Sequence, residues 1–210
     1  MRYDKCFTKH NVTLKDASAY GDVSCKRYMT ESNIVVKNFD RLVGSYCKSK
    51  KITKPMTNDA LLYDFSRIDI EDVNFLFIEF KSGTINKNAC VDIHRKLTES
   101  NNMLEMLIEE VDEKYLQEHG AYILVYDLDK QTCYDTRNTL SEKEIQYSSS
   151  LTYITERLFE LSSSKIFKLF EAGFGLSQYD GSVLHTVITM EKDRFNRNVD
   201  VLSADYVINE

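Results

Sequence analysis

Two acidic residues and one lysine have the residue types of a metal-dependent hydrolytic site. Glu79 and Lys81 stand two positions apart at the end of an apolar run, and Asp64 lies 15 residues before Glu79. Residues two apart on a β-strand point to the same face. Two carboxylates held close together attract a hard divalent cation such as Mg²⁺, which can activate a bound water. Lys81 could orient that water or stabilise charge on a phosphate, so the three residues suit phosphodiester hydrolysis.

A β-hairpin would bring these three side chains together. Two apolar, aromatic-rich runs, residues 60–70 and 75–81, flank a short acidic turn, which is a typical hairpin pattern. With a four-residue turn, Asp64 lies opposite Lys81 and shares its face. A register shift of one residue exchanges the two faces, so Asp69 is the reserve candidate for the first acid.

Further helices and strands predict an α/β fold. Apolar spacing predicts helices over 32–47 and 89–111, a buried strand over 121–127, a helical region from a capping box at Ser141 to near Gly173, a strand over 183–189 and a helix over 191–198. The second helix would cross over to a parallel strand. We therefore expect a mixed central β-sheet flanked by helices in a single domain, 1–210, with a core at about 32–127 and a C-terminal helix-strand-helix extension at about 141–210.

The segment 77–83, with the sequence FIEFKSG, resembles the signature strand of the PD-(D/E)XK nuclease superfamily. The order helix, β-hairpin, helix, strand over residues 32–127 is similar to the restriction-endonuclease-like core of that superfamily. The rest of the chain resembles small bacterial or phage proteins of this type. The resemblance implies a nuclease dependent on Mg²⁺ or Mn²⁺, in which Asp64 and Glu79 hold the metal and Lys81 assists catalysis.

The chain departs from the superfamily pattern at several positions. No proline precedes Asp64, and the acid often supplied by the first helix has only Glu31 and Asp40 as local options. Lys96, in the helix after the hairpin, could reach a phosphate, although a solvated helix face explains that lysine more simply. A second acid-x-Lys triplet at 112–114 lies in a polar stretch, so the triplet alone does not define a site.

The charge distribution is compatible with either a nucleic-acid partner or a protein partner. The net charge is −6, but residues 1–60 hold 12 Lys and Arg against 6 Asp and Glu, a local excess of +6. Candidate nucleic-acid contacts in this part are Lys48, Lys50, Lys51 and Lys54, which a solvated loop would also explain. We expect a nucleic-acid partner, with DNA favoured over RNA. The acidic total fits the alternative, a catalytically inactive fold that binds a protein partner as an inhibitor-type module of phage or defence systems, with Glu79 and Lys81 as a structural ion pair.

Cysteine usage and hydropathy favour a cytoplasmic location. The five cysteines include no C-x-x-C pair, which argues against a disulfide framework. Cys6 with His10 and Cys90 with His94 share a C-x3-H spacing, but scattered cysteines explain the pattern better than zinc. The longest apolar run is too short to span a membrane, and the N-terminus has no signal-peptide core. We expect no membrane partner and leave open whether the protein is a homodimer.

Overall fold

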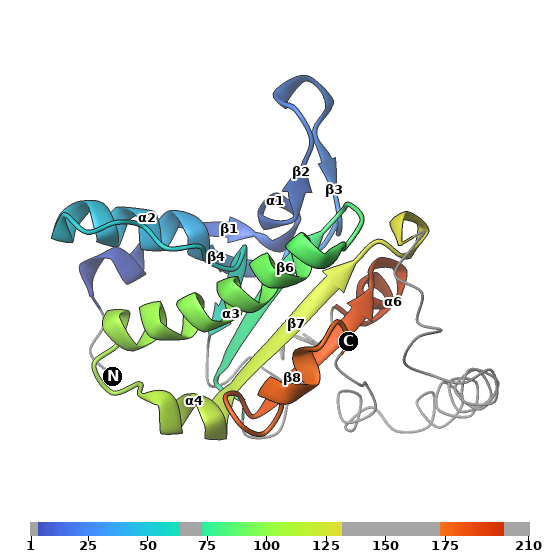
Figure 1. Cartoon of the computed structure of the whole chain (residues 1–210). Coiled ribbons are helices and arrows are strands. Elements are labelled where there is room, and N and C mark those ends of the chain that lie inside the picture. The colour runs from blue at the N-terminus through green and yellow to red at the C-terminus, as the bar shows by residue number, and fades with distance from the viewer. Residues whose placement is uncertain (1–3, 64–72, 132–172, 200–210) are drawn as a thin grey trace, which may run out of the picture.

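The computed structural model describes residues 4–63, 73–131 and 173–199. Its centre is a six-stranded sheet (Figure 1) made of β1 (Asn11–Thr13), β4 (Val35–Asn38), β5 (Ala60–Tyr63), β6 (Phe75–Lys81), β7 (Gly120–Tyr126) and β8 (Thr186–Glu191). The α-helices are α1 (Leu14–Ala17), α2 (Phe39–Lys50), α3 (Lys87–Leu107), α4 (Glu113–His119) and α6 (Lys192–Asn198). A separate pair of short strands, β2 (Ala19–Tyr20) and β3 (Arg27–Tyr28), projects from the sheet. Short 3-10 helices are η1 (Lys5–Thr8), η2 (Val23–Cys25), η3 (Leu128–Lys130) and η6 (Leu176–Tyr179).

The sheet is mixed, as the sequence predicts. Its strand order is β1-β4-β5-β6-β7-β8. The first four strands pair antiparallel in that order, whereas β6 with β7 and β7 with β8 are parallel. Helix α3 makes the connection from β6 to β7, which confirms the expected helical crossover between parallel strands. The coarse prediction of an α/β protein with a mixed sheet flanked by helices is therefore confirmed.

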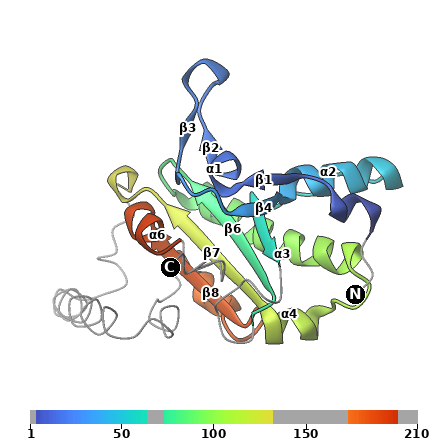
Figure 2. The ribbon, with the colours of Figure 1, turned by 180° about the vertical axis from the view of Figure 1, so that it is seen from behind.

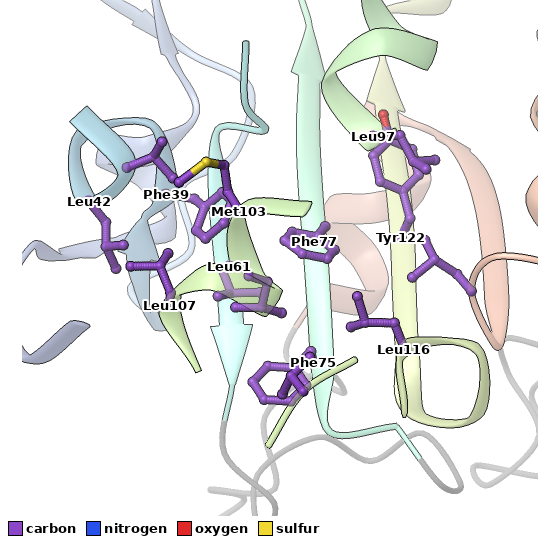
Figure 3. Close-up of a cluster of buried hydrophobic side chains, with 14 of the residues drawn as sticks. Phe39, Leu42, Leu61, Phe75, Phe77, Leu97, Met103, Leu107, Leu116 and Tyr122 are labelled. Carbon is purple, nitrogen blue, oxygen red and sulfur yellow. The ribbon is translucent and has the colours of Figure 1, made fainter. Parts of the chain in front are cut away.

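Strand β6 is enclosed by side chains on both faces of the sheet, and the turned view in Figure 2 shows the face opposite α3. On the α3 face, Phe77 packs edge-on against Phe39 of α2 with ring centroids 5.4 Å apart, and Figure 3 shows Leu97 and Tyr122 in the same cluster. On the other face, Phe80 packs against Phe195 of α6 at 5.8 Å. Burial on both faces explains why the run 75–81 is almost uniformly apolar.

The helix expected over residues 32–47 is wrong in its first part, where the chain forms β4. Val35 and Val36 are β-branched and suit a strand, and β4 pairs with both β1 and β5. The helix begins only at Phe39, because the Asn38 side chain caps it by accepting a hydrogen bond from the Arg41 amide at 2.9 Å. The apolar spacing of this segment fits either conformation, and pairing with two strands decides it.

The predicted hairpin exists, but its predicted register is wrong. Ala60 lies opposite Ile78 and Tyr63 lies opposite Phe75, so the connection between the strands is far longer than a four-residue turn. The turn length sets which residues face each other, and an incorrect turn displaces every pair. Asp64 and Asp69 both lie outside the described residues.

The elements after the hairpin follow the predicted order. Helix α3 ends at Leu107, and the acidic residues after it start a separate helix, α4, which Asp112 caps by accepting from the Tyr115 amide at 2.7 Å. Strand β7, strand β8 and helix α6 lie close to their predicted ranges. The helical region expected from Ser141 falls largely outside the described residues. No helix in the described ranges is long and apolar enough to cross a membrane.

Candidate functional site

Asp59, which the sequence analysis did not single out, lies beside Glu79. It directly precedes β5, and the β5–β6 register places it next to Glu79 on the neighbouring strand. Its Oδ2 atom accepts a hydrogen bond from the Phe80 amide at 2.8 Å. Its backbone carbonyl accepts from the Phe39 amide at 3.1 Å, which fixes it at the start of α2. Both the pairing of β5 with β6 and the hydrogen bond to the first residue of α2 therefore fix the position of Asp59.

Glu79 is the centre of a cluster of four charged side chains. It is fully buried, yet its Oε1 atom lies 3.1 Å from the Lys81 Nζ atom and 2.8 Å from the Lys96 Nζ atom. Lys96 also reaches Glu79 Oε2 at 3.0 Å and Asp59 Oδ1 at 3.5 Å. We call Asp59, Glu79, Lys81 and Lys96 the four-charge cluster. It contains two acids and two bases, each acid within reach of Lys96.

The local sequence explains how the cluster forms. Glu79 and Lys81 alternate with Ile78 and Phe80 along β6, so both charged side chains point to the α3 face. On α3, Lys96 precedes the buried Leu97, and its side chain is only 17 % exposed because its stem runs along the helix–sheet interface. Asp59 and Lys81 keep 28 % and 24 % of their side-chain surface exposed. The cluster is therefore closed around Glu79 and open to solvent at Asp59 and Lys81.

Burial changes the acidity of this cluster. Desolvation and the neighbouring Asp59 carboxylate raise the pKa of Glu79 to about 7, while Lys96 and Lys81 act in the opposite direction. For Lys96, burial acts to lower the pKa, but Glu79 and Asp59 outweigh it and raise the pKa above its ordinary value. The hydroxyl of Tyr122 is also buried, and its burial together with Glu79 and Asp59 raises its pKa. The pKa of Glu79 therefore lies near neutral pH, while Lys96 stays charged.

The predicted site residues divide into three groups. The structure brings Glu79 and Lys81 together, and it places Lys96 in contact with both acids rather than on a solvated helix face. Asp40 is engaged by Lys54 and Thr57, and Glu31 by Lys15, so neither lies in the cluster. Asp64 and Asp69 lie outside the described residues. The sequence does contain a signal for Asp59, because this acid directly precedes the apolar run 60–63. Asp59 could be recognised as the partner of Glu79 only with the correct strand register.

Three of the four predicted nucleic-acid lysines, Lys48, Lys50 and Lys51, lie at the end of α2 that is far from the four-charge cluster. Lys48 and Lys50 lie in its last turn and Lys51 ends it in a left-handed conformation. Asp59 contacts the first residue of this helix, and 12 residues of α-helix span roughly 18 Å. Lys54 returns along the helix and pairs with Asp40 at 2.6 Å. Lys48, Lys50 and Lys51 are therefore distant from the four-charge cluster, and Lys54 is paired with Asp40 rather than with Asp59 or Glu79.

The four-charge cluster supplies some, but not all, of the oxygen ligands that a hard cation such as Mg²⁺ prefers. Asp59 and Glu79 offer carboxylate oxygens from adjacent strands, and Mg²⁺ can bind through one or two carboxylates while it keeps several waters. Within the described ranges, however, no group of three or more His, Cys, Asp or Glu side chains is arranged to hold a metal ion. A cation at this place would share the two carboxylates with Lys96.

Comparison with known proteins gives no independent assignment. No protein-family model, no curated protein and no solved structure matches the chain. The chemistry of the four-charge cluster and of the surfaces around it is therefore the basis for assigning a function to the chain.

Proposed function

We propose that the protein is a metal-dependent nuclease that hydrolyses phosphodiester bonds of DNA or RNA at the four-charge cluster. The observation that carries this proposal is the position of Asp59 beside Glu79, with Lys81 two residues further along the same strand face. An acid on one strand followed by Glu-x-Lys on its antiparallel neighbour is the residue pattern of the PD-(D/E)XK superfamily. The order α2, β5–β6 hairpin, α3, β7 supports a restriction-endonuclease-like core.

Each residue of the cluster has a distinct role in this proposal. Asp59 and Glu79 hold Mg²⁺ or Mn²⁺, which when bound supplies an activated water and an electrophilic contact to phosphate. Lys81 is partly exposed and is positioned to donate a hydrogen bond to a phosphate oxygen and to neutralise charge that develops there. Lys96 keeps the two carboxylates together and favours the ionised form of Glu79, which metal binding requires.

The first test is cleavage of a panel of single- and double-stranded DNA and RNA with and without Mg²⁺ or Mn²⁺. We expect metal-dependent cleavage by the wild type and a loss of at least about 100-fold in Asp59→Asn, Glu79→Gln and Lys81→Ala. Lys114→Ala is the matched control, because Lys114 belongs to the second acid-x-Lys triplet and is exposed. Asp64→Asn, tested beside Asp59→Asn, decides which acid is the partner of Glu79. Cleavage that survives Glu79→Gln and Lys81→Ala would refute the assignment of the site.

A second candidate function is supported by the charge balance of the cluster. Its two lysines can neutralise its two carboxylates without a metal ion, so the four residues also suit a structural ion network in a protein that acts by binding a partner. Calorimetric titration with Mg²⁺ and Mn²⁺ separates the candidates. Absence of both metal binding and cleavage, with a folded wild type, would favour the partner-binding function.

A further inference from the structure

Three cations lie around the imidazole of His10, which stands between η1 and β1. The pKa of His10 is lowered first by burial, and then by the charges of Lys9, Arg41 and Lys37, in that order. In the described part of the chain, none of these three cations forms an ion pair with an acid. The acid next to Arg41, Asp40, is engaged by other side chains. We call Lys9, His10, Lys37, Arg41 and Ser45 the basic patch.

Lys37 places a positive charge beneath this patch, and its contacts are with neutral groups. The residue is 3 % exposed, and its Nζ atom donates to the Lys9 carbonyl at 3.4 Å and to the Asn11 side-chain oxygen. The ammonium also lies over the rings of Phe7 and Tyr63, 5.8 and 5.5 Å from their centroids. Carbonyl and ring contacts lower the cost of burying the ammonium, but they leave its charge in place. An anion bound close by would therefore be stabilised by Lys37 without touching it.

Ser45 and His10 supply a further hydrogen-bond donor to the patch. The Ser45 Oγ atom lies 2.9 Å from the His10 Nε2 atom. Because the pKa of His10 is below its ordinary value of 6.5, the ring is neutral at pH 7, and the pair holds two polar hydrogens but uses only one between them. The second hydrogen is on Nδ1 or on Oγ, according to the tautomer, and either position can donate to an anion. Arg41 lies four residues before Ser45 on α2, so its guanidinium shares the helix face of this donor.

The basic patch lies close to the four-charge cluster. The Asn38 amide donates to the His10 carbonyl at 2.9 Å, and Asn38 lies opposite Ala60, the residue that follows Asp59. Strand β4 lies between β1 and β5 (Figure 1), so His10 is two strand spacings, about 10 Å, from Ala60. One strand of B-form DNA rises about 3.4 Å per nucleotide. The patch is therefore about three nucleotides away from Asp59 along such a strand.

We propose that the basic patch binds the phosphate backbone of a nucleic-acid strand whose scissile phosphate lies at the four-charge cluster. This inference rests on the proposed nuclease function and identifies where the substrate is held. Arg41 and Lys9 are exposed, so a guanidinium and an ammonium can each contact a phosphate. Lys37 adds its charge from below, and the Ser45–His10 pair adds a neutral donor. Such contacts fix the position of a strand and carry no sequence preference.

The test is fluorescence anisotropy of the full chain with a labelled oligo-dT strand and with a labelled mixed-sequence duplex, in EDTA, over a series of salt concentrations. EDTA prevents metal-dependent cleavage, so binding is measured alone. We expect Arg41→Gln and Lys9→Gln each to weaken binding about tenfold and to reduce the slope of log K against log salt concentration by about one. Arg41→Lys keeps the charge and should keep the slope. Lys114→Gln is the control, because Lys114 is an exposed lysine of α4 that approaches Glu118 at 3.7 Å.

The outcomes separate this inference from the proposed nuclease function. Unchanged affinity and slope in Arg41→Gln and Lys9→Gln would overturn the basic patch, and metal-dependent cleavage by the wild type would still stand. Absence of cleavage, with binding that is lost in the two variants, would refute the nuclease and support the patch. Binding of inorganic phosphate by calorimetry, without binding of either oligonucleotide, would also overturn the inference. Circular dichroism confirms that each variant is folded, since Arg41 takes part in the cap of α2 through its backbone amide.

Discussion

Glu79 should make the metal-free protein less stable as the pH rises from 5 to 8, and Glu79→Gln should remove this part of the pH dependence. The pKa of Glu79 in the folded protein is about 7, whereas its ordinary value is 4.5. Between these two values the folded protein still holds the proton that the unfolded chain has lost. Stability therefore falls as the pH rises through this window, and it levels off above about pH 8, where both states are ionised.

The size of the effect follows from the difference between the two pKa values. One pKa unit corresponds to about 1.4 kcal/mol, so the full difference amounts to roughly 3 kcal/mol of unfolding free energy. Most of it falls between pH 5 and pH 8. Glutamine has nearly the same shape and does not titrate, so relative to the wild type Glu79→Gln should gain roughly 2–3 kcal/mol over that interval. Lys96 does not disturb the comparison, because its pKa is raised above its ordinary value of 10.5.

Urea unfolding at pH 5, 6, 7 and 8 in the presence of EDTA measures this effect. The quantity of interest is the difference in unfolding free energy between Glu79→Gln and the wild type at each pH, with Glu118→Gln as an exposed-carboxylate control. A difference that changes by less than about 1 kcal/mol across the series refutes the reasoning. It would mean that Lys81 and Lys96 outweigh burial and Asp59, and that Glu79 is ionised throughout.

Three further predictions concern single side chains. Lys96→Met should weaken Mg²⁺ binding at pH 7 by calorimetry, because it removes the positive charge 2.8 Å from Glu79 that favours the ionised form of this carboxylate, and an unchanged affinity would contradict that role of Lys96. Lys37→Met should leave the melting temperature unchanged or raise it. Burial lowers the pKa of Lys37, which shows that its charge is costly there, and its partner Asn11 can bond to water instead. A fall of several degrees in the melting temperature would show that the lysine stabilises the fold. Asn38→Ala should lower the unfolding free energy by about 1 kcal/mol in urea, because the cap of α2 is lost, and no loss would contradict that role.

The parts of the site that depend on local periodicity could be predicted from the sequence. Glu79 and Lys81 share a face of β6 because alternation along a strand has a fixed period of two. The crossover helix and the buried strand β7 followed from an apolar stripe and an unbroken apolar run. These patterns predict the folded structure correctly because each depends only on residues that are a few positions apart in the sequence.

The parts that depend on pairing between distant segments could not be predicted. The register of β5 against β6 depends on where β5 ends, and the sequence shows no glycine or proline there to mark it. Taking the polar residues 71–74 as the turn made Asp64 the natural partner of Lys81, and it left Asp59 before the strand. Strand β4 was wrongly predicted for the same reason. Its apolar spacing fits a helix, and its pairing with the distant strands β1 and β5 makes it a strand.

The energetic cost of the four-charge cluster favours a chemical role over a purely structural one. Replacing a buried ion network by apolar side chains of similar volume is often neutral or stabilising, so stability alone gives little reason to bury Glu79. Phe75 and Phe77 occupy equivalent positions on the same face of β6 and are fully buried apolar residues. At Glu79 the strand instead carries a fully buried acid in contact with two lysines, while Asp59 and Lys81 remain partly exposed at the edge of the cluster. Two partly exposed charged residues beside a buried acid whose pKa is raised to about 7 give the proposed metal and phosphate chemistry an open side, which an inert ion network would not require.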